Sequence, residues 1–197
     1  VRVRAWQGIP DITVDKAEQV ELLSSAPWGS EIDLDNHVVD VELSDVVNSA
    51  SRVGITTSGT VVSVREDSGI IMRCVTCRRV TRDGECSSQN CVGKVESQQD
   101  VRLRLVIDNG DVTASVLINK DASLGLMNTT ESKMAKAIEN EGQMEYVQSI
   151  RDYILGRELV VNGRTIVDEQ GAMILADKAE ISATDAAMLA TEVRAQW

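Results

Sequence analysis

All four cysteines of the chain lie within 18 positions, and no other stretch restricts the fold so strongly. Cys74 and Cys77 form one close pair, and Cys86 and Cys91 form a second pair eight residues further on. Two such pairs on successive turns can bring four thiolates to one tetrahedral point, which is what a structural Zn²⁺ site requires. The spacing therefore predicts a zinc ribbon at about residues 70–95, inserted in a larger β domain.

Two alternatives to zinc are a pair of disulfides and four unconnected thiols. The sequence shows no secretory signal and no apolar run long enough to span a membrane, so we expect a cytoplasmic protein without a membrane partner. A reducing compartment favours metal binding over disulfides. A catalytic zinc would keep one position open for water, and the only histidine, His37, lies far upstream. We therefore predict that the metal is structural.

The charge is unevenly distributed along the chain. The formal net charge is −11, which argues against a generally basic nucleic-acid binder. Residues 65–104 nevertheless hold eight basic and six acidic side chains, whereas the segments on both sides are strongly acidic. A positive patch on an acidic body can attract phosphate locally. The alternative is that these side chains form an ordinary solvated surface.

The clearest strand signal follows the cysteines. Apolar residues occupy every second position of 101–107, with Arg102 and Arg104 on the opposite face, and residues 112–118 alternate in the same way. Between them, residues 108–111 read Asp-Asn-Gly-Asp, a sequence typical of a tight turn. The pattern predicts a hairpin with one apolar face.

Weaker patterns complete the expected order of elements. We expect a helix that begins at Thr129 or Thr130, bends at Gly142 and ends at Gly156. A last amphipathic helix is expected from Thr184 to Trp197. The remaining expected strands are residues 1–6, 12–14, 20–23, 53–65 (one bent strand or a strand pair), 158–161 and 172–176.

This order predicts a mainly β protein. A strand, an inserted ribbon, a hairpin, a helix and two more strands are typical of a five-stranded OB-fold barrel with its helix between strands 3 and 4. We divide the chain into residues 1–35, which close a preceding OB fold and continue into a linker, the OB-fold domain at 36–182, and a C-terminal assembly helix at 183–197.

Several motifs resemble archaeal replication protein A, the single-stranded DNA-binding protein of replication and repair. The similarity covers nearly the whole chain and is most specific around the cysteines. The motifs are SGIIMRCVTCRRV at 68–80, DGEC at 83–86, GKVE at 93–96, DVR at 100–102 and WQGIPDITV at 6–14. Many relatives end the ribbon with a Cys and a His, whereas this chain offers Cys91 and no nearby histidine.

The resemblance implies a non-enzymatic subunit that coats single-stranded DNA in the cytoplasm, at the nucleoid. Few aromatic residues are present for base stacking, so we expect mainly phosphate contacts, made across the barrel face and ribbon. The expected DNA-binding residues are Arg65, Arg73, Arg78, Arg79, Arg102, Arg104 and Trp6. Trp6 is equally well explained as a core or interdomain anchor.

The resemblance also implies partner proteins. In the eukaryotic relative, a C-terminal helix packs with helices of two smaller OB-fold subunits to form a heterotrimer. Leu189, Val193 and Trp197 lie on the matching stripe of this chain. The alternative function is therefore an assembly module whose last helix recruits subunits, a polymerase or a primase and which binds DNA weakly. The sequence offers no combination of a nucleophile with a general base that would support an enzymatic function.

Overall fold

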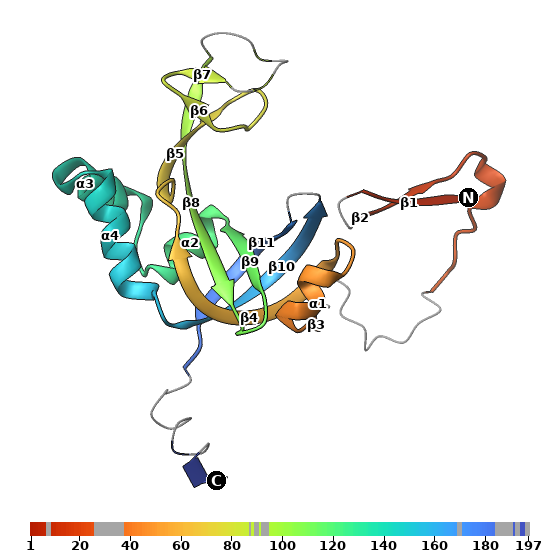
Figure 1. The fold of residues 1–197 in the computed structure, drawn as a ribbon. Coiled ribbons are helices and arrows are strands. Elements are labelled where there is room, and N and C mark those ends of the chain that lie inside the picture. The colour runs from red at the N-terminus through yellow and green to blue at the C-terminus, as the bar shows by residue number, and fades with distance from the viewer. Residues whose placement is uncertain are drawn as a thin grey trace.

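The computed structural model describes residues 1–6, 9–25, 38–86, 88, 91, 95–168, 171–183, 191, 194 and 195, and it describes only the backbone at residues 5, 6, 9, 10 and 168. Its main feature is a closed β barrel (Figure 1). The barrel strands are β4 (Val53–Val64), β8 (Ser97–Asp108), β9 (Thr113–Ile118), β10 (Glu158–Asp168) and β11 (Gly171–Ile181).

The pairing of these strands confirms the predicted OB fold. Their order around the ring is β4, β10, β11, β9, β8, and a β4–β8 pairing closes it. Neighbours are antiparallel except β9 and β11, which run parallel. The hairpin expected from the alternating residues is β8–β9, with Leu103 opposite Ile118. The region around Gly54 and Gly59 forms one long strand, β4, whose register shifts between Val61 and Ser63.

Alternation along each strand places the apolar side chains inside the barrel. Leu103, Leu105 and Ile107 of β8 are at most 1% exposed and pack against Val116 and Ile118 of β9 in one hydrophobic core. A short helix that the sequence analysis did not predict, α1 (Leu43–Asn48), adds its own apolar residues to this core.

The predicted helical segment lies between the third and fourth barrel strands, as expected. It contains α3 (Glu131–Glu141) and α4 (Gln143–Ile154), and it is preceded by a further helix that was not predicted, α2 (Lys120–Leu126). The hydroxyl of Thr130 accepts from the backbone N–H of Lys133 and caps α3. Gly142 has a φ of 97° and separates α3 from α4, because glycine adopts this conformation without steric penalty.

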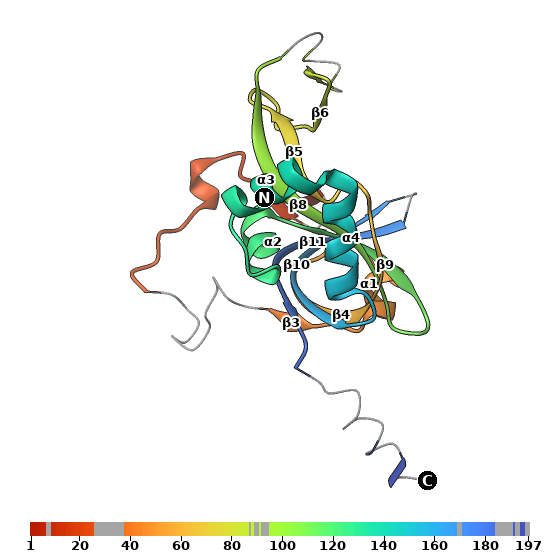
Figure 2. The same cartoon turned by 90° about the vertical axis from the view of Figure 1, so that its left-hand side faces the viewer.

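The cysteine-containing insertion projects from the barrel between its first and second strands (Figures 1 and 2). Its stalk is β5 (Gly69–Cys74), which pairs with the first half of β8 from Arg102 to Ser97. At the far end, β6 (Thr81–Arg82) and β7 (Glu85–Cys86) form a small hairpin. One long strand, β8, thus belongs to both the barrel and the ribbon.

The N-terminal strands form a sheet of their own. β1 (Arg2–Trp6) pairs with β2 (Ile9–Thr13), and a 3₁₀ turn follows at Ala17–Gln19. The short strand β3 (Val39–Asp40) belongs to the barrel sheet instead, where it lies parallel to β4. The strand predicted at 20–23 is wrong. Leu22 is 97% exposed there, and within the described residues this apolar run pairs with no strand.

Most of the predicted C-terminal helix, including Leu189, Val193 and Trp197, lies outside the described residues, as does His37. The helix and the domain boundaries therefore stay predictions. Within the described part of the chain, no helix has both the length and the apolar character needed to cross a membrane.

Candidate metal centre and nucleic-acid interface

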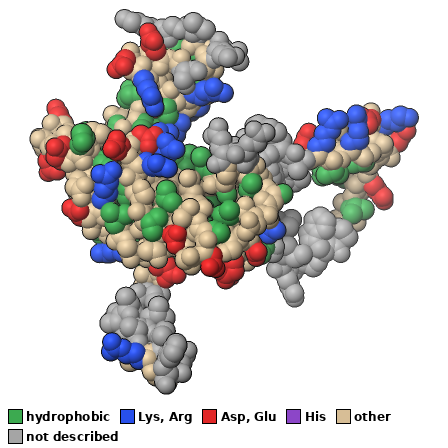
Figure 3. Space-filling model, in the orientation of Figure 1, with side chains coloured by type: hydrophobic (Ala, Val, Ile, Leu, Met, Phe, Trp, Pro, Cys, Tyr) green, Lys and Arg blue, Asp and Glu red, His purple; other side chains and the backbone are tan. Residues whose placement is uncertain are grey.

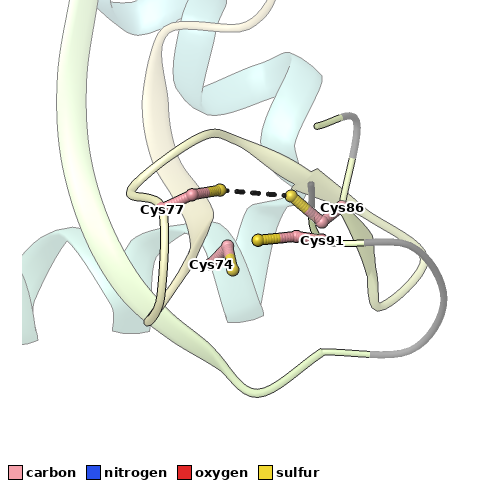
Figure 4. Close-up of side chains that lie close together, drawn as sticks. All are labelled: Cys74, Cys77, Cys86 and Cys91. Carbon is pink, nitrogen blue, oxygen red and sulfur yellow. Dashed lines mark hydrogen bonds between the residues drawn. The ribbon is translucent and has the colours of Figure 1, made fainter. Parts of the chain in front are cut away.

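The four cysteines converge at the tip of the ribbon (Figure 4). Their Sγ atoms all lie within 4.8 Å of one another, and those of Cys77 and Cys86 are 3.4 Å apart. Cys74 ends β5 and is buried, Cys77 follows in a turn, and Cys86 ends β7. None of the four is in a disulfide, so the disulfide alternative does not describe this structure.

Backbone hydrogen bonds around the sulfurs hold this arrangement. The N–H of Cys74 donates to the carbonyl of Arg79 at 2.8 Å, and the N–H of Arg78 donates back to the carbonyl of Cys74 at 2.9 Å. The N–H of Ser88 donates to Sγ of Cys86 at 3.4 Å. With these contacts, the sulfurs of both cysteine pairs point toward one another (Figure 4).

The donor set fits a tetrahedral dication. Zinc–sulfur bonds of about 2.3 Å place tetrahedral sulfurs about 3.8 Å apart, close to the separations found here. Hydrogen bonds from the backbone N–H of Arg79 and from the other thiols lower the pKa of Cys77 to about 7. The hydrogen bond with Cys77, together with burial, raises the pKa of Cys91 to about 12. Ionisation of one thiol thus disfavours ionisation of the next, and a cation bound among the sulfurs would favour the thiolate form of all four.

The outer face of the barrel carries a row of four side chains on adjacent strands. Arg104 of β8 lies opposite Leu117 of β9, Leu117 lies beside Leu175 of β11, and Leu175 lies opposite Arg164 of β10. The neighbours of Arg104, Leu117 and Leu175 along their strands are core residues, so these three side chains point outward. Arg164 precedes the buried Thr165 and lines a surface hollow together with Leu117 and Leu175. The row therefore has an apolar centre with a guanidinium at each end.

Two adjoining hollows share Leu117 and form a groove along this face. The larger, of about 400 Å³, extends toward the ribbon stalk. The smaller is a shallow hollow of about 10 Å³ that extends toward the turn after β4. Basic residues of the larger hollow are Arg73, Arg102, Lys120 and Arg164, and the smaller is lined by Arg65, Arg104 and Met173. On the surface, Lys and Arg side chains gather where the ribbon joins the barrel, interleaved with acidic ones (Figure 3).

Acidic side chains form ion pairs with some of these arginines. Asp100 forms an ion pair with Arg73, and Asp67 accepts hydrogen bonds from both Arg102 and Arg104, at 2.5 and 2.8 Å. Burial lowers the pKa of Arg102, although the charge of Asp67 opposes this shift. The groove is consequently less positive than its count of arginines suggests.

The structure brings only part of the predicted DNA-binding set together. Arg65, Arg73, Arg102 and Arg104 line the groove, whereas Arg78 and Arg79 are exposed on the ribbon. The backbone of Trp6 lies in β1, and its side chain is outside the described residues. Tyr146 is a core residue, and the ring of Tyr153 lies under the guanidinium of Arg157 at 4.9 Å.

Sequence reasoning missed part of the groove. The missed residues are Lys120, Arg164, Leu117, Met173 and Leu175. One signal was available, because residues 172–176 are apolar at every position although a barrel strand has only one inward face. The two arginine partners, Asp67 and Asp100, were also missed.

Comparison with known proteins gives matches to solved structures only. No protein-family model and no curated protein matches the sequence. One similar structure is described as "Structure and Conformational Change of a Replication Protein A Heterotrimer Bound to ssDNA". It has a TM-score of 0.51 and is 12% identical in sequence. The match covers 81% of this chain and 40% of that chain. Another, "Yeast RPA bound to ssDNA", has a TM-score of 0.42 and 15% identity, over 72% of this chain and 85% of that one. The first match shows that the chain shares the OB fold of a replication protein A subunit.

Proposed function

We propose that this protein binds single-stranded DNA as a subunit of the replication protein A type, without enzymatic activity. The observation that carries the proposal is the outward row Arg104, Leu117, Leu175 and Arg164. It crosses the face that contains the second and third strands of the OB barrel, where such barrels bind oligonucleotides. An apolar floor between cations suits a strand whose bases lie on the floor and whose phosphates reach the rims.

The composition of the floor determines the expected mode of binding. Leucine and methionine replace the aromatic rings on which bases normally stack, so each base gains less on binding. Phosphate contacts should therefore contribute most of the affinity, which should fall steeply with salt and depend little on sequence. The cations for these contacts are Arg65, Arg73, Arg102, Arg104, Lys120 and Arg164 in the groove, with Arg78 and Arg79 on the ribbon.

The ribbon cysteines would hold one structural Zn²⁺. Cys74, Cys77, Cys86 and Cys91 supply four sulfur ligands, which leaves no position open for water. The ion would supply charge neutralisation and cross-linking, and it would take no part in any reaction. By fixing the ribbon, it would hold Arg78 and Arg79 beside the barrel face.

The test is fluorescence anisotropy with labelled oligo-dT. Arg104→Ala/Arg164→Ala removes the two ends of the row, and Arg151→Ala/Arg157→Ala removes the same charge from α4 and the turn after it. We expect at least a tenfold loss of affinity for the first variant and less than twofold for the second, because each phosphate contact contributes about 1 kcal/mol. Equal affinities for both variants would contradict the assigned face.

We further propose that residues 183–197 join smaller OB-fold subunits through Leu189, Val193 and Trp197. The apolar spacing of that segment and the heterotrimer named for the similar structure support this. Residues 1–35 would complete a neighbouring OB fold, and the site of action would be the cytoplasmic nucleoid. Co-expression with candidate subunits and mass measurement of the complex, with and without residues 184–197, tests the assembly.

A further inference from the structure

Asp67 occupies the space between the two central arginines of β8. Its Oδ2 accepts from Nη2 of Arg102 at 2.5 Å and from Nη1 of Arg104 at 2.8 Å. Burial would raise the pKa of Asp67, but the hydrogen bond from Arg104 and the charges of both arginines outweigh it and leave the pKa below its usual value. One ionised oxygen thus accepts hydrogen bonds from two guanidinium groups. Both arginines also line a hollow on the ribbon side of the barrel face.

The backbone on both sides of this carboxylate is fixed. Ser68 is fully buried, and its hydroxyl exchanges hydrogen bonds with the backbone of Arg104. The Nε2 atom of Gln143 on α4 donates to the Ser68 carbonyl at 2.6 Å. The N–H of Arg65 donates to the carbonyl of Arg104 at 2.8 Å. The side chain of Asp67, which is 37% exposed, can therefore rotate away without moving the turn or the barrel.

A phosphodiester has the chemistry to replace this carboxylate. Both carry one negative charge and present paired oxygens to a guanidinium, so the exchange leaves the two arginines neutralised. We propose that Asp67 occupies a phosphate position of the nucleic-acid site, and that a bound strand displaces it from Arg102 and Arg104. This inference rests on the proposed function.

The tethered carboxylate makes the site selective for a polymer. A free anion must compete with a group that is always beside the arginines, and its loss of translational freedom opposes binding. A strand already held by Arg65 or Arg164 presents its next phosphate at a high local concentration. Asp67 thus disfavours isolated anions and lowers the affinity for every strand by a constant factor.

The experiment compares Asp67→Asn with the wild-type chain, again by anisotropy with oligo-dT. Asp111→Asn is the matched control, since it removes the same charge from the exposed turn at the other end of the β8–β9 hairpin. We expect Asp67→Asn to bind about three- to tenfold more tightly, because partly exposed ion pairs of this kind are worth about 1 kcal/mol. The salt slope should become more negative by up to about 0.9, the value for one phosphate. Asp111→Asn should change neither quantity.

The outcomes separate this inference from the proposed function. If the wild type binds and Asp67→Asn binds equally or more weakly, Asp67 does not compete with phosphate and the inference is wrong, while the DNA-binding proposal stands. If neither chain binds oligo-dT, both proposals fail. Thermal unfolding verifies that the variant is folded, and Asp67→Ser provides a second, smaller replacement with the same expected direction.

Discussion

Ser68 and Arg104 exchange two hydrogen bonds across the junction between ribbon and barrel. The Ser68 hydroxyl donates to the carbonyl of Arg104 at 3.2 Å and accepts from its N–H at 3.0 Å. At the point where β8 leaves the barrel, the turn after β4 thus bonds to the backbone of β8 in the way that a neighbouring strand would. The same pair fixes the backbone that presents Arg104 to the groove.

Ser68→Ala should lower the free energy of unfolding by about 1–3 kcal/mol, because it leaves a buried backbone N–H without its partner. Chemical denaturation measures the change. Ser63→Ala, at a half-buried position on the adjacent β4, is the control and should have a much smaller effect. A Ser68→Ala variant as stable as the wild type would mean that the junction does not depend on this hydroxyl.

Cys77→Ser should reduce the bound zinc from about one ion per chain to well below one, because a serine hydroxyl does not ionise and is a poor zinc ligand. Elemental analysis after dialysis against a weak chelator measures this. The barrel should keep its cooperative thermal transition, since the four cysteines are not part of its hydrophobic core. Arg82→Ser, on the same small hairpin, should retain the metal. Zinc-free wild-type protein would contradict the assignment.

Leu117→Phe should increase the affinity for oligo-dT. The side chain faces outward at the centre of the groove, so a ring there adds a stacking surface without entering the core. Stacking on an aromatic residue is worth about 1–3 kcal/mol per base, which predicts at least a fivefold gain in anisotropy titrations. Ile166→Phe, next to the row on β10, should give a smaller gain. Weaker binding by Leu117→Phe would show that the bases do not lie on this floor.

Thr57→Val should stabilise the barrel by about 1 kcal/mol. Thr57 is 4% exposed, and its hydroxyl has no hydrogen-bond partner in the described part of the chain. Valine has nearly the same shape and removes the penalty of burying that hydroxyl. Thr165→Val is the matched comparison with the opposite expected sign, since the Thr165 hydroxyl accepts from the N–H of Arg52 at 2.8 Å. Denaturant midpoints compare the two variants.

The sequence by itself determined the features that depend on short-range chemistry. Cysteine spacing indicated the four-sulfur cluster, alternation indicated the β8–β9 hairpin, and Thr130 and Gly142 marked the ends of α3. Each follows from residues close together in the chain, where spacing alone sets the geometry. The order of these elements was then enough to predict the OB barrel.

Only the tertiary structure decided what the outer face contains. Arg104 and Arg164 are 60 positions apart and share a row because β9 and β11 pair in parallel between them. Asp67 reaches the arginines of β8 because the inserted ribbon folds back onto that strand. Sequence alternation tells which side of a strand a residue faces, but not which strands become neighbours. Strand order and register are set by long-range packing, and they determine which charges meet.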